Sequence, residues 1–189
     1  MRHTVSTASL IFAVGLVLHW IVADRLDEEA HEQALRYFSQ HQLEIANHKY
    51  LTVIDFTKPS FVKRMYIFNL ETGEMERYLV AHGQSSGHTY AQHFSNEIGS
   101  HRSCRGFFIT GEKYDGKHGT SLRLHGKEKG INDNAFRRDI VIHGANWVSY
   151  RAVLENGGRL GRSWGCPAVP VSEVDAIAEK LGSVYKNGC

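Results

Sequence analysis

The tightest local constraints in this chain lie in Arg162-Ser163-Trp164-Gly165-Cys166-Pro167-Ala168-Val169-Pro170. Pro167 has no N–H and disfavours the α region for the residue before it, so Cys166 belongs on an extended or turn backbone. Gly165 has no Cβ, which lets a substrate or another backbone approach closely. We therefore expect a cysteine on a tight turn and not inside a helix.

A histidine precedes this turn in the chain. The run Ile140-Val141-Ile142 is apolar and β-branched, which is typical of a buried strand. His143 follows the run, and Gly144 is expected to end the strand. A histidine on a strand end and a cysteine on a turn suit a Cys/His pair built from two segments. We expect Cys166 to be the nucleophile and His143 the base that activates it.

These blocks resemble the L,D-transpeptidases, the YkuD-type peptidoglycan enzymes. Their pattern is a His-Gly or His-Ser on a strand followed by Ser/Thr-His-Gly-Cys, and this chain has His143-Gly144 and then Ser163-Trp164-Gly165-Cys166. The Trp-Gly-Cys-Pro-Ala form is most similar to the murein L,D-transpeptidase catalytic domain family. The resemblance runs from about Tyr50 to Val184. Its further blocks are residues Tyr50 to Phe56, His82 to Asn96 and Gly130 to Ala135.

The resemblance implies catalytic roles for Cys166, His143 and Gly144. In the family a backbone carbonyl beside the histidine orients the ring, and here that carbonyl belongs to Gly144. The oxyanion of a tetrahedral intermediate needs donors already in place, and the backbone N–H groups of Gly165 and Cys166 are candidates. The expected oxyanion and substrate-binding set is Gly165, Ser163, Trp164 and Arg162. No metal and no other cofactor is expected.

Two positions depart from the family pattern. Position 164 is Trp where the wider family has His, and position 168 is Ala where it often has Arg. A missing Arg removes a fixed positive charge near the substrate carboxylate or the oxyanion. Arg162 or Arg159 is our hypothesis for the compensating charge.

The resemblance also implies the reaction. A protonated thiol is a poor nucleophile, and a neighbouring His favours the thiolate and then carries the proton to the leaving amine. The expected donor is a peptidoglycan tetrapeptide stem, attacked at the carbonyl of its third residue, diaminopimelate, so that D-Ala leaves. The thioester then passes to the amine of another stem and gives a 3→3 cross-link. Water as acceptor would give an L,D-carboxypeptidase, and a protein amine would give attachment of that protein to the wall.

Two further functions stay open. A zinc-dependent peptidoglycan peptidase is favoured by the 12 histidines but opposed by the absence of a His-Glu-x-x-His motif. A catalytically inactive wall-binding domain is opposed by the retention of both Cys166 and His143. The net charge of +2 without a Lys/Arg block predicts no nucleic-acid partner.

The N-terminus reads as a targeting segment. Residues 1–23 are apolar after a short basic start, which predicts a signal peptide or a membrane anchor, the latter associating with the inner membrane through residues 5–23. Either alternative implies export to the periplasm or cell envelope. We expect residues 24–49 to form a polar helical lead-in, and the resemblance implies an L,D-transpeptidase-like catalytic domain over residues 50–189.

From Tyr50 the pattern is that of many short strands separated by Gly-bearing turns. The expected fold is mainly β, an L,D-transpeptidase-like β-sandwich or barrel with a few short helices and an N-terminal helix. The long polar loop from His82 to Ser103 is expected to be functional. The expected short helices are Asn132 to Arg138, Asn146 to Leu154 and Val171 to Leu181.

Overall fold

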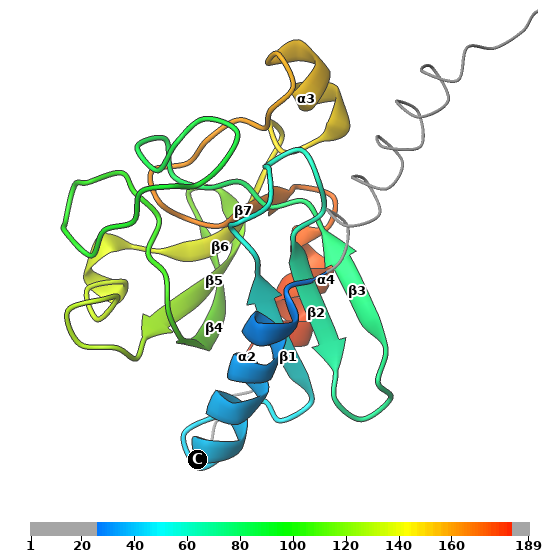
Figure 1. The fold of residues 1–189 in the computed structure, drawn as a ribbon, viewed down its shortest axis with the longest axis vertical. Helices are drawn as coiled ribbons and strands as arrows, with labels where there is room; N and C mark the ends of the chain where they lie inside the picture. Colours follow the sequence, from blue (N-terminus) through cyan, green and yellow to red (C-terminus); the bar gives the residue numbers. More distant parts are fainter. Residues whose placement is uncertain (1–25, 183–189) are drawn as a thin grey trace, which may run out of the picture.

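The computed structural model describes residues 26–182, which form two β-sheets with helices at their sides (Figure 1). The expected signal peptide or anchor, residues 1–23, lies outside the described residues. Within residues 26–182, no helix is long and apolar enough to cross a membrane.

The first sheet is antiparallel, with its strands in the order β1-β2-β3. Its strands are β1 Tyr50–Ile54, β2 Met65–Asn69 and β3 Met75–Tyr78. The turn between β2 and β3 contains Gly73 at φ 75°, a conformation that glycine adopts without steric cost. Met65, Tyr66 and Ile67 of the central strand are fully buried, as expected from its apolar run.

The second sheet carries the residues of the expected pair. Its strands are β4 Phe108–Gly116, β5 Gly119–Gly126, β6 Val141–Ala145 and β7 Ala168–Pro170, in the order β4-β5-β6-β7. β6 and β7 are parallel, whereas the other neighbours are antiparallel. Parallel neighbours need a crossover connection, and residues 146–167 supply it with the short helix α3 Tyr150–Glu155.

Two longer helices flank the sheets (Figure 1). α4, Val174–Leu181, buries Val174, Ile177, Ala178 and Leu181 and contacts strands of both sheets, so it joins them. α2, Glu28–Gln40, begins at the N-cap Asp27 and packs against β1. Its Tyr37 ring stacks on Phe107 with centroids 4.0 Å apart, which attaches the helical lead-in to the domain.

The mainly β architecture expected from the sequence is confirmed, with one correction at the site. Gly144 does not end its strand, because β6 continues to Ala145 and Gly144 pairs with Val169 of β7. A Cβ at Gly144 would lie 2.9 Å from a methyl carbon of Val174 on α4. Gly144 is therefore required for close packing of the helix on the sheet.

The short helices are shorter than expected. Of residues 132–138 only Phe136–Arg138 form a helix, a single 3₁₀ turn named η1. α3 begins at Tyr150 because the Ser149 hydroxyl caps it by accepting from the Ala152 N–H at 3.1 Å. α4 begins only after residues 171–173, which form a turn.

Candidate active site

His143 lies in the middle of β6 and is 4% exposed. Its Nδ1 atom lies 3.0 Å from the carbonyl oxygen of Gly144. Because a carbonyl can only accept, this bond requires the proton on Nδ1, and in the neutral ring the lone pair is then on Nε2. The carbonyl expected to orient the ring is thus in contact with it, and Nε2 is the nitrogen able to accept a proton.

Cys166 lies in a bend just before β7. The parallel register pairs Ala168 with His143, so Cys166, two residues earlier, lies beside Val141. Val141 and His143 are two residues apart, and their side chains therefore project from the same face of the sheet, about 7 Å apart along the strand. The fold thus places Cys166 in the bend that leads into β7, beside the strand that carries His143.

The thiol is hydrogen-bonded to backbone and not to the imidazole in this conformation. Its Sγ lies 3.4 Å from the carbonyl oxygen of Asp139, to which the thiol donates. Among residues 26–182 the structure gives no hydrogen bond between Sγ and the His143 ring. Transfer of the thiol proton to Nε2 therefore requires rotation of the Cys166 side chain away from Asp139.

The electrostatics favour a neutral pair. Burial raises the pKa of the Cys166 thiol, although a hydrogen bond from the Val141 backbone and the charge of Arg138 both oppose this. Burial lowers the pKa of His143, with smaller contributions in the same direction from His118 and Lys117. A thiolate stabilised by an imidazolium, as the sequence suggested, is therefore not the favoured resting state. The neutral imidazole is instead available as a general base.

Ser163 organises the turn that carries the cysteine. Its hydroxyl donates to the Cys166 carbonyl at 2.6 Å and accepts from the Gly165 N–H at 3.1 Å. The residue is 6% exposed, and its side chain supports the turn. Because the Gly165 N–H is already bonded, Cys166 keeps the more favourable N–H of the two oxyanion candidates.

Gly165 has the close backbone approach that the sequence predicted. Its φ is 123°, and a Cβ there would lie 2.8 Å from the carbonyl oxygen of Arg102. Ser103 secures the same approach, because its hydroxyl donates to the Gly165 carbonyl at 3.0 Å. The loop of residues 82–103 thus packs directly behind the turn.

Trp164 is the exposed member of the motif, with 66% of its surface accessible. Its indole stacks on His101 with ring centroids 4.8 Å apart and 11° between the planes. His101 has a φ of 53°, uncommon for a residue with a side chain, and its Nδ1 lies 3.0 Å from Gln84 Nε2. A flat aromatic surface therefore lies two residues from Cys166.

Position 168 and Arg162, the position of the family Arg and one of the two residues expected to compensate for it, lie in different surroundings. Ala168 is fully buried in an apolar cluster with Leu79, Ala81, Ala145, Val148 and Leu160. Arg162 donates through Nη1 to the carbonyls of Gln84 and Gly87, at 3.2 and 3.1 Å. The charge that lowers the Cys166 pKa belongs to Arg138, at the end of η1.

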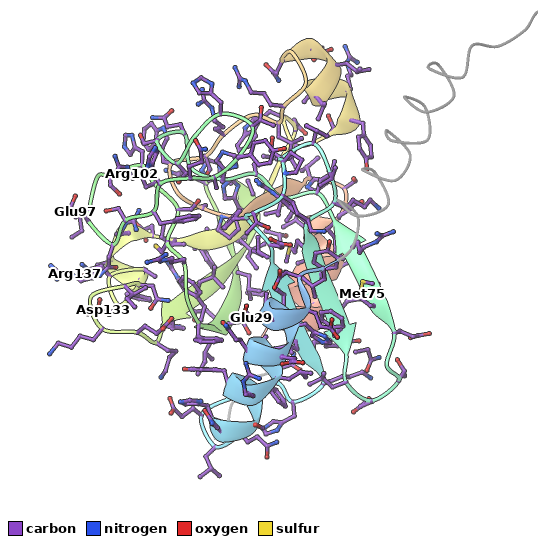
Figure 2. All side chains as sticks on the ribbon, viewed as in Figure 1. Glu29, Met75, Glu97, Arg102, Asp133 and Arg137 are labelled. Carbon is purple, nitrogen blue, oxygen red and sulfur yellow. The ribbon has the colours of Figure 1, made fainter. Side chains whose placement is uncertain are left out.

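Arg138 also joins the loop of residues 82–103 to the segment before β6. Its guanidinium donates to the carbonyls of Ser95 and Arg102, to Ser100 Oγ at 3.2 Å and to Cys104 Sγ at 2.8 Å. Figure 2 shows Glu97 and Arg102 on the same rim of the molecule as Asp133 and Arg137. The hydrogen bonds of Arg138 hold the loop of residues 82–103 against the second sheet.

Sequence reasoning did not find Arg138, Asp139 or His118. Asp139 has a φ of 51°, and its place between η1 and β6 is the one available signal, because Asp tolerates this conformation better than most residues. Arg138 and His118 have no motif around them. Their positions depend on pairing between segments that are distant in the chain.

An apolar cavity of about 450 Å³ lies beside the site, between α2, β1 and β4. Its lining reaches Gly165 and Pro167 but includes neither Cys166 nor His143. It is therefore not the cleft in which the thiol would meet a substrate. Within the described residues, no three His, Cys, Asp or Glu side chains are grouped so that they could hold a metal ion.

The structure is a mainly β domain with a cysteine on a tight turn and a carbonyl-bonded histidine on the strand beside that turn, two residue types that serve together in cysteine-dependent acyl-transfer enzymes. A comparison with protein families matches residues 22–185 to the L,D-transpeptidase catalytic domain. The chain belongs to this family, and peptidoglycan is the substrate class that membership implies. Searches of curated proteins and of solved structures gave no match.

Proposed function

We propose that this protein catalyses cysteine-dependent acyl transfer between peptidoglycan stem peptides. The observation that carries the proposal is the His143 ring, bonded through Nδ1 to the Gly144 carbonyl on the strand beside the Cys166 turn. Burial keeps this ring neutral, as a base must be before it accepts a proton. Membership of the family supports peptidoglycan as the substrate. The Cys166–His143 pair supports acyl transfer through a thiol as the reaction.

In the proposed reaction His143 first accepts a proton and then donates it. His143 Nε2 takes the proton of the Cys166 thiol, and the thiolate forms a bond to the carbonyl carbon of the third stem residue. The Cys166 N–H donates to the resulting oxyanion. The intermediate collapses with loss of D-Ala, whose amine receives the proton from His143, and a thioester remains. The amine of a second stem then attacks the thioester and gives a proton to His143 Nε2. The 3→3 amide bond forms, the C–S bond breaks, and His143 returns the proton to the departing Cys166 thiolate.

Muropeptide analysis tests this proposal. Purified disaccharide-tetrapeptides are incubated with the wild type, with Cys166→Ala and with Cys104→Ala, which removes a buried thiol that the reaction does not use. We expect free D-Ala and 3→3 dimers from the wild type and Cys104→Ala, and neither product from Cys166→Ala. Retention of product by Cys166→Ala would remove the proposed nucleophile.

The same experiment separates the other functions. Tripeptide and D-Ala without dimers would identify water as the acceptor and the protein as an L,D-carboxypeptidase. Loss of product on addition of a chelator would favour the zinc peptidase. Binding of the polymer without any product would favour a wall-binding domain.

We also propose that the protein acts in the cell envelope, where peptidoglycan lies. The apolar residues 1–23 support this proposal, either as a cleaved signal peptide or as an inner-membrane anchor. Cell fractionation with mass spectrometry of the mature N-terminus distinguishes the two. Recovery of the intact chain only in the cytoplasm would contradict export.

A further inference from the structure

The imidazole of His118 lies flat against that of His143. Their ring centroids are 4.5 Å apart, and the ring planes differ by 23°. His118 is in the turn between β4 and β5 and is exposed, whereas His143 beneath it is buried. The tip of this hairpin therefore covers the ring that serves as the base, and no step of the proposed reaction yet uses His118.

The hairpin is fixed so that its tip remains in this place. Ser121 of β5 lies opposite His143 in the antiparallel register, which brings the adjacent turn close to the ring. The Thr120 hydroxyl donates to Asp175 on α4, and Lys113 forms an ion pair with Glu179 on the same helix at 3.2 Å. These contacts come from two separate places on the hairpin, so they restrict its tilt as well as its distance from β6.

His143 is consequently restrained on three sides. The Gly144 carbonyl holds Nδ1, His118 lies on one face, and the Trp147 ring lies edge-on at 6.4 Å and 72°. The hydrogen bond alone would still allow the ring to tilt about it, whereas a stacked ring opposes that motion. Of the described residues, His118 and Lys117 in the hairpin turn are the charged neighbours that lower the His143 pKa.

We propose that His118 is a positioning residue, whose stacked ring holds the His143 imidazole in the orientation set by its hydrogen bond to the Gly144 carbonyl. Its effect on turnover rests on the function proposed above, but the restraint on His143 is a property of the fold. A base held in the productive orientation lowers the entropic cost of the transition state, so loss of the restraint lowers kcat and not substrate affinity.

The test compares His118→Ala, which removes the stack, with His118→Phe, which keeps a flat ring there. Lys117→Ala is the matched control, because it removes the neighbouring charge and leaves the ring. The readouts are the NMR pH titration of the His143 imidazole and the kcat and KM for D-Ala release. We expect His118→Ala to raise the His143 pKa, because burial is relieved, and to lower kcat about tenfold with KM within about twofold. We expect His118→Phe to retain kcat within about threefold, and Lys117→Ala to retain it fully.

Wild-type kcat and titration in His118→Ala would overturn the proposal. An equal kcat loss in His118→Phe would also overturn it, because the imidazole itself would then be needed. If the wild type releases no D-Ala, the proposed function fails and the titration alone decides the restraint on His143. If His118→Ala does not fold, Thr120→Val removes the hydrogen bond between the hairpin tip and Asp175 of α4, and an unchanged His143 titration in that variant counts against the proposal.

Discussion

The sulfur of Cys166 lies 3.4 Å from the carbonyl oxygen of Asp139, one of two non-glycine residues within 26–182 that have a positive φ. Asp139 lies in the left-handed conformation at the C-cap of η1, just before β6, and its carbonyl accepts from the thiol. A thiol that donates to a carbonyl is held in its protonated form, because a thiolate has no proton to donate. This contact and burial both oppose ionisation of the resting cysteine.

The first prediction concerns alkylation of Cys166 by iodoacetamide. An ordinary cysteine thiol has a pKa of about 8.5. Because burial raises the Cys166 pKa, the alkylation rate of Cys166 should increase only at a pH above that value. Peptide-resolved mass spectrometry as a function of pH measures Cys166 separately from Cys104 and Cys189. A rate that is already maximal at pH 6 would instead show a resting thiolate–imidazolium pair.

The second prediction concerns Gly165→Ala. The new Cβ would lie 2.8 Å from the Arg102 carbonyl oxygen. The alanine backbone would also have to keep a φ of 123°, which residues with a side chain rarely adopt. The turn must shift, and we expect turnover to fall about a hundredfold or more, since a displacement of about 1 Å has that effect. Gly157→Ala is the control, because its φ is also positive but nothing lies within 4 Å of its Cβ. Equal losses in both variants would trace the effect to backbone strain.

The third prediction concerns Trp164. We expect the exposed indole, supported by His101, to contact the substrate outside the reacting bond. Trp164→Ala should then raise KM about fivefold to tenfold with kcat little changed, which is the result for a uniform binding contact worth about 1 kcal/mol. Leu154→Ala, at a site that is 84% exposed on α3, is the control. A fall in kcat without a change in KM would contradict a binding role.

The fourth prediction concerns Arg138. Arg138→Gln removes a charge that lowers the Cys166 pKa, so the alkylation profile should move to higher pH. It also leaves the Ser95 and Arg102 carbonyls without their donor, and we expect the free energy of unfolding to fall by about 1–3 kcal/mol. Arg137→Gln, at the exposed neighbouring position, should change neither quantity. An unchanged alkylation profile in Arg138→Gln would show that its charge does not reach the thiol.

The fifth prediction concerns acid stability. Arg64 Nη2 donates to Nδ1 of the buried His82 at 2.7 Å, and burial followed by this cation lowers the His82 pKa to about 4. In the unfolded chain the His82 pKa is near 6.5. Between about pH 6.5 and pH 4, His82 therefore binds a proton in the unfolded chain but stays neutral in the folded chain. Stability is therefore full above about pH 6.5 and falls by up to about 3 kcal/mol as the pH drops to 4.

Urea unfolding at a series of pH values measures this loss. His82→Asn keeps an acceptor for Arg64 in its side-chain oxygen but cannot titrate, so its stability should depend less on pH in this window. His88→Gln, at an exposed position of the same loop, should retain the wild-type dependence. An identical slope in His82→Asn would assign the acid loss to other groups.

The sequence predicted the fold wherever local chemistry was sufficient. The β-branched run at residues 140–142 and the Gly73 turn needed only their neighbours, and β6 and the β2–β3 hairpin formed there. Gly144 was misjudged as a strand end, because its lack of a side chain serves α4 packing, a long-range property. The helix predicted for residues 171–181 is present, but it begins three residues later than predicted, at Val174.

In the candidate site, too, the residues that carry a local motif could be predicted, whereas properties that depend on long-range packing could not. Cys166, His143 and Gly144 carry a motif, and the structure has His143 and Gly144 on β6 and Cys166 in the bend before β7, the strand that pairs with β6. The protonation state of the thiol could not be predicted, because it depends on burial and on the Asp139 carbonyl. Arg138 could not be predicted either, since its role follows from the packing of the 82–103 loop against η1.

The parallel pairing of β6 with β7 also bears on how the molecule is made. The two halves of the Cys/His pair meet only after the crossover of residues 146–167 has closed, and such non-local pairing is slow compared with hairpin formation. In a newly made chain, Cys166 therefore lies away from His143 until the last strand of the sheet docks. The candidate pair is thereby assembled only when the native topology is complete.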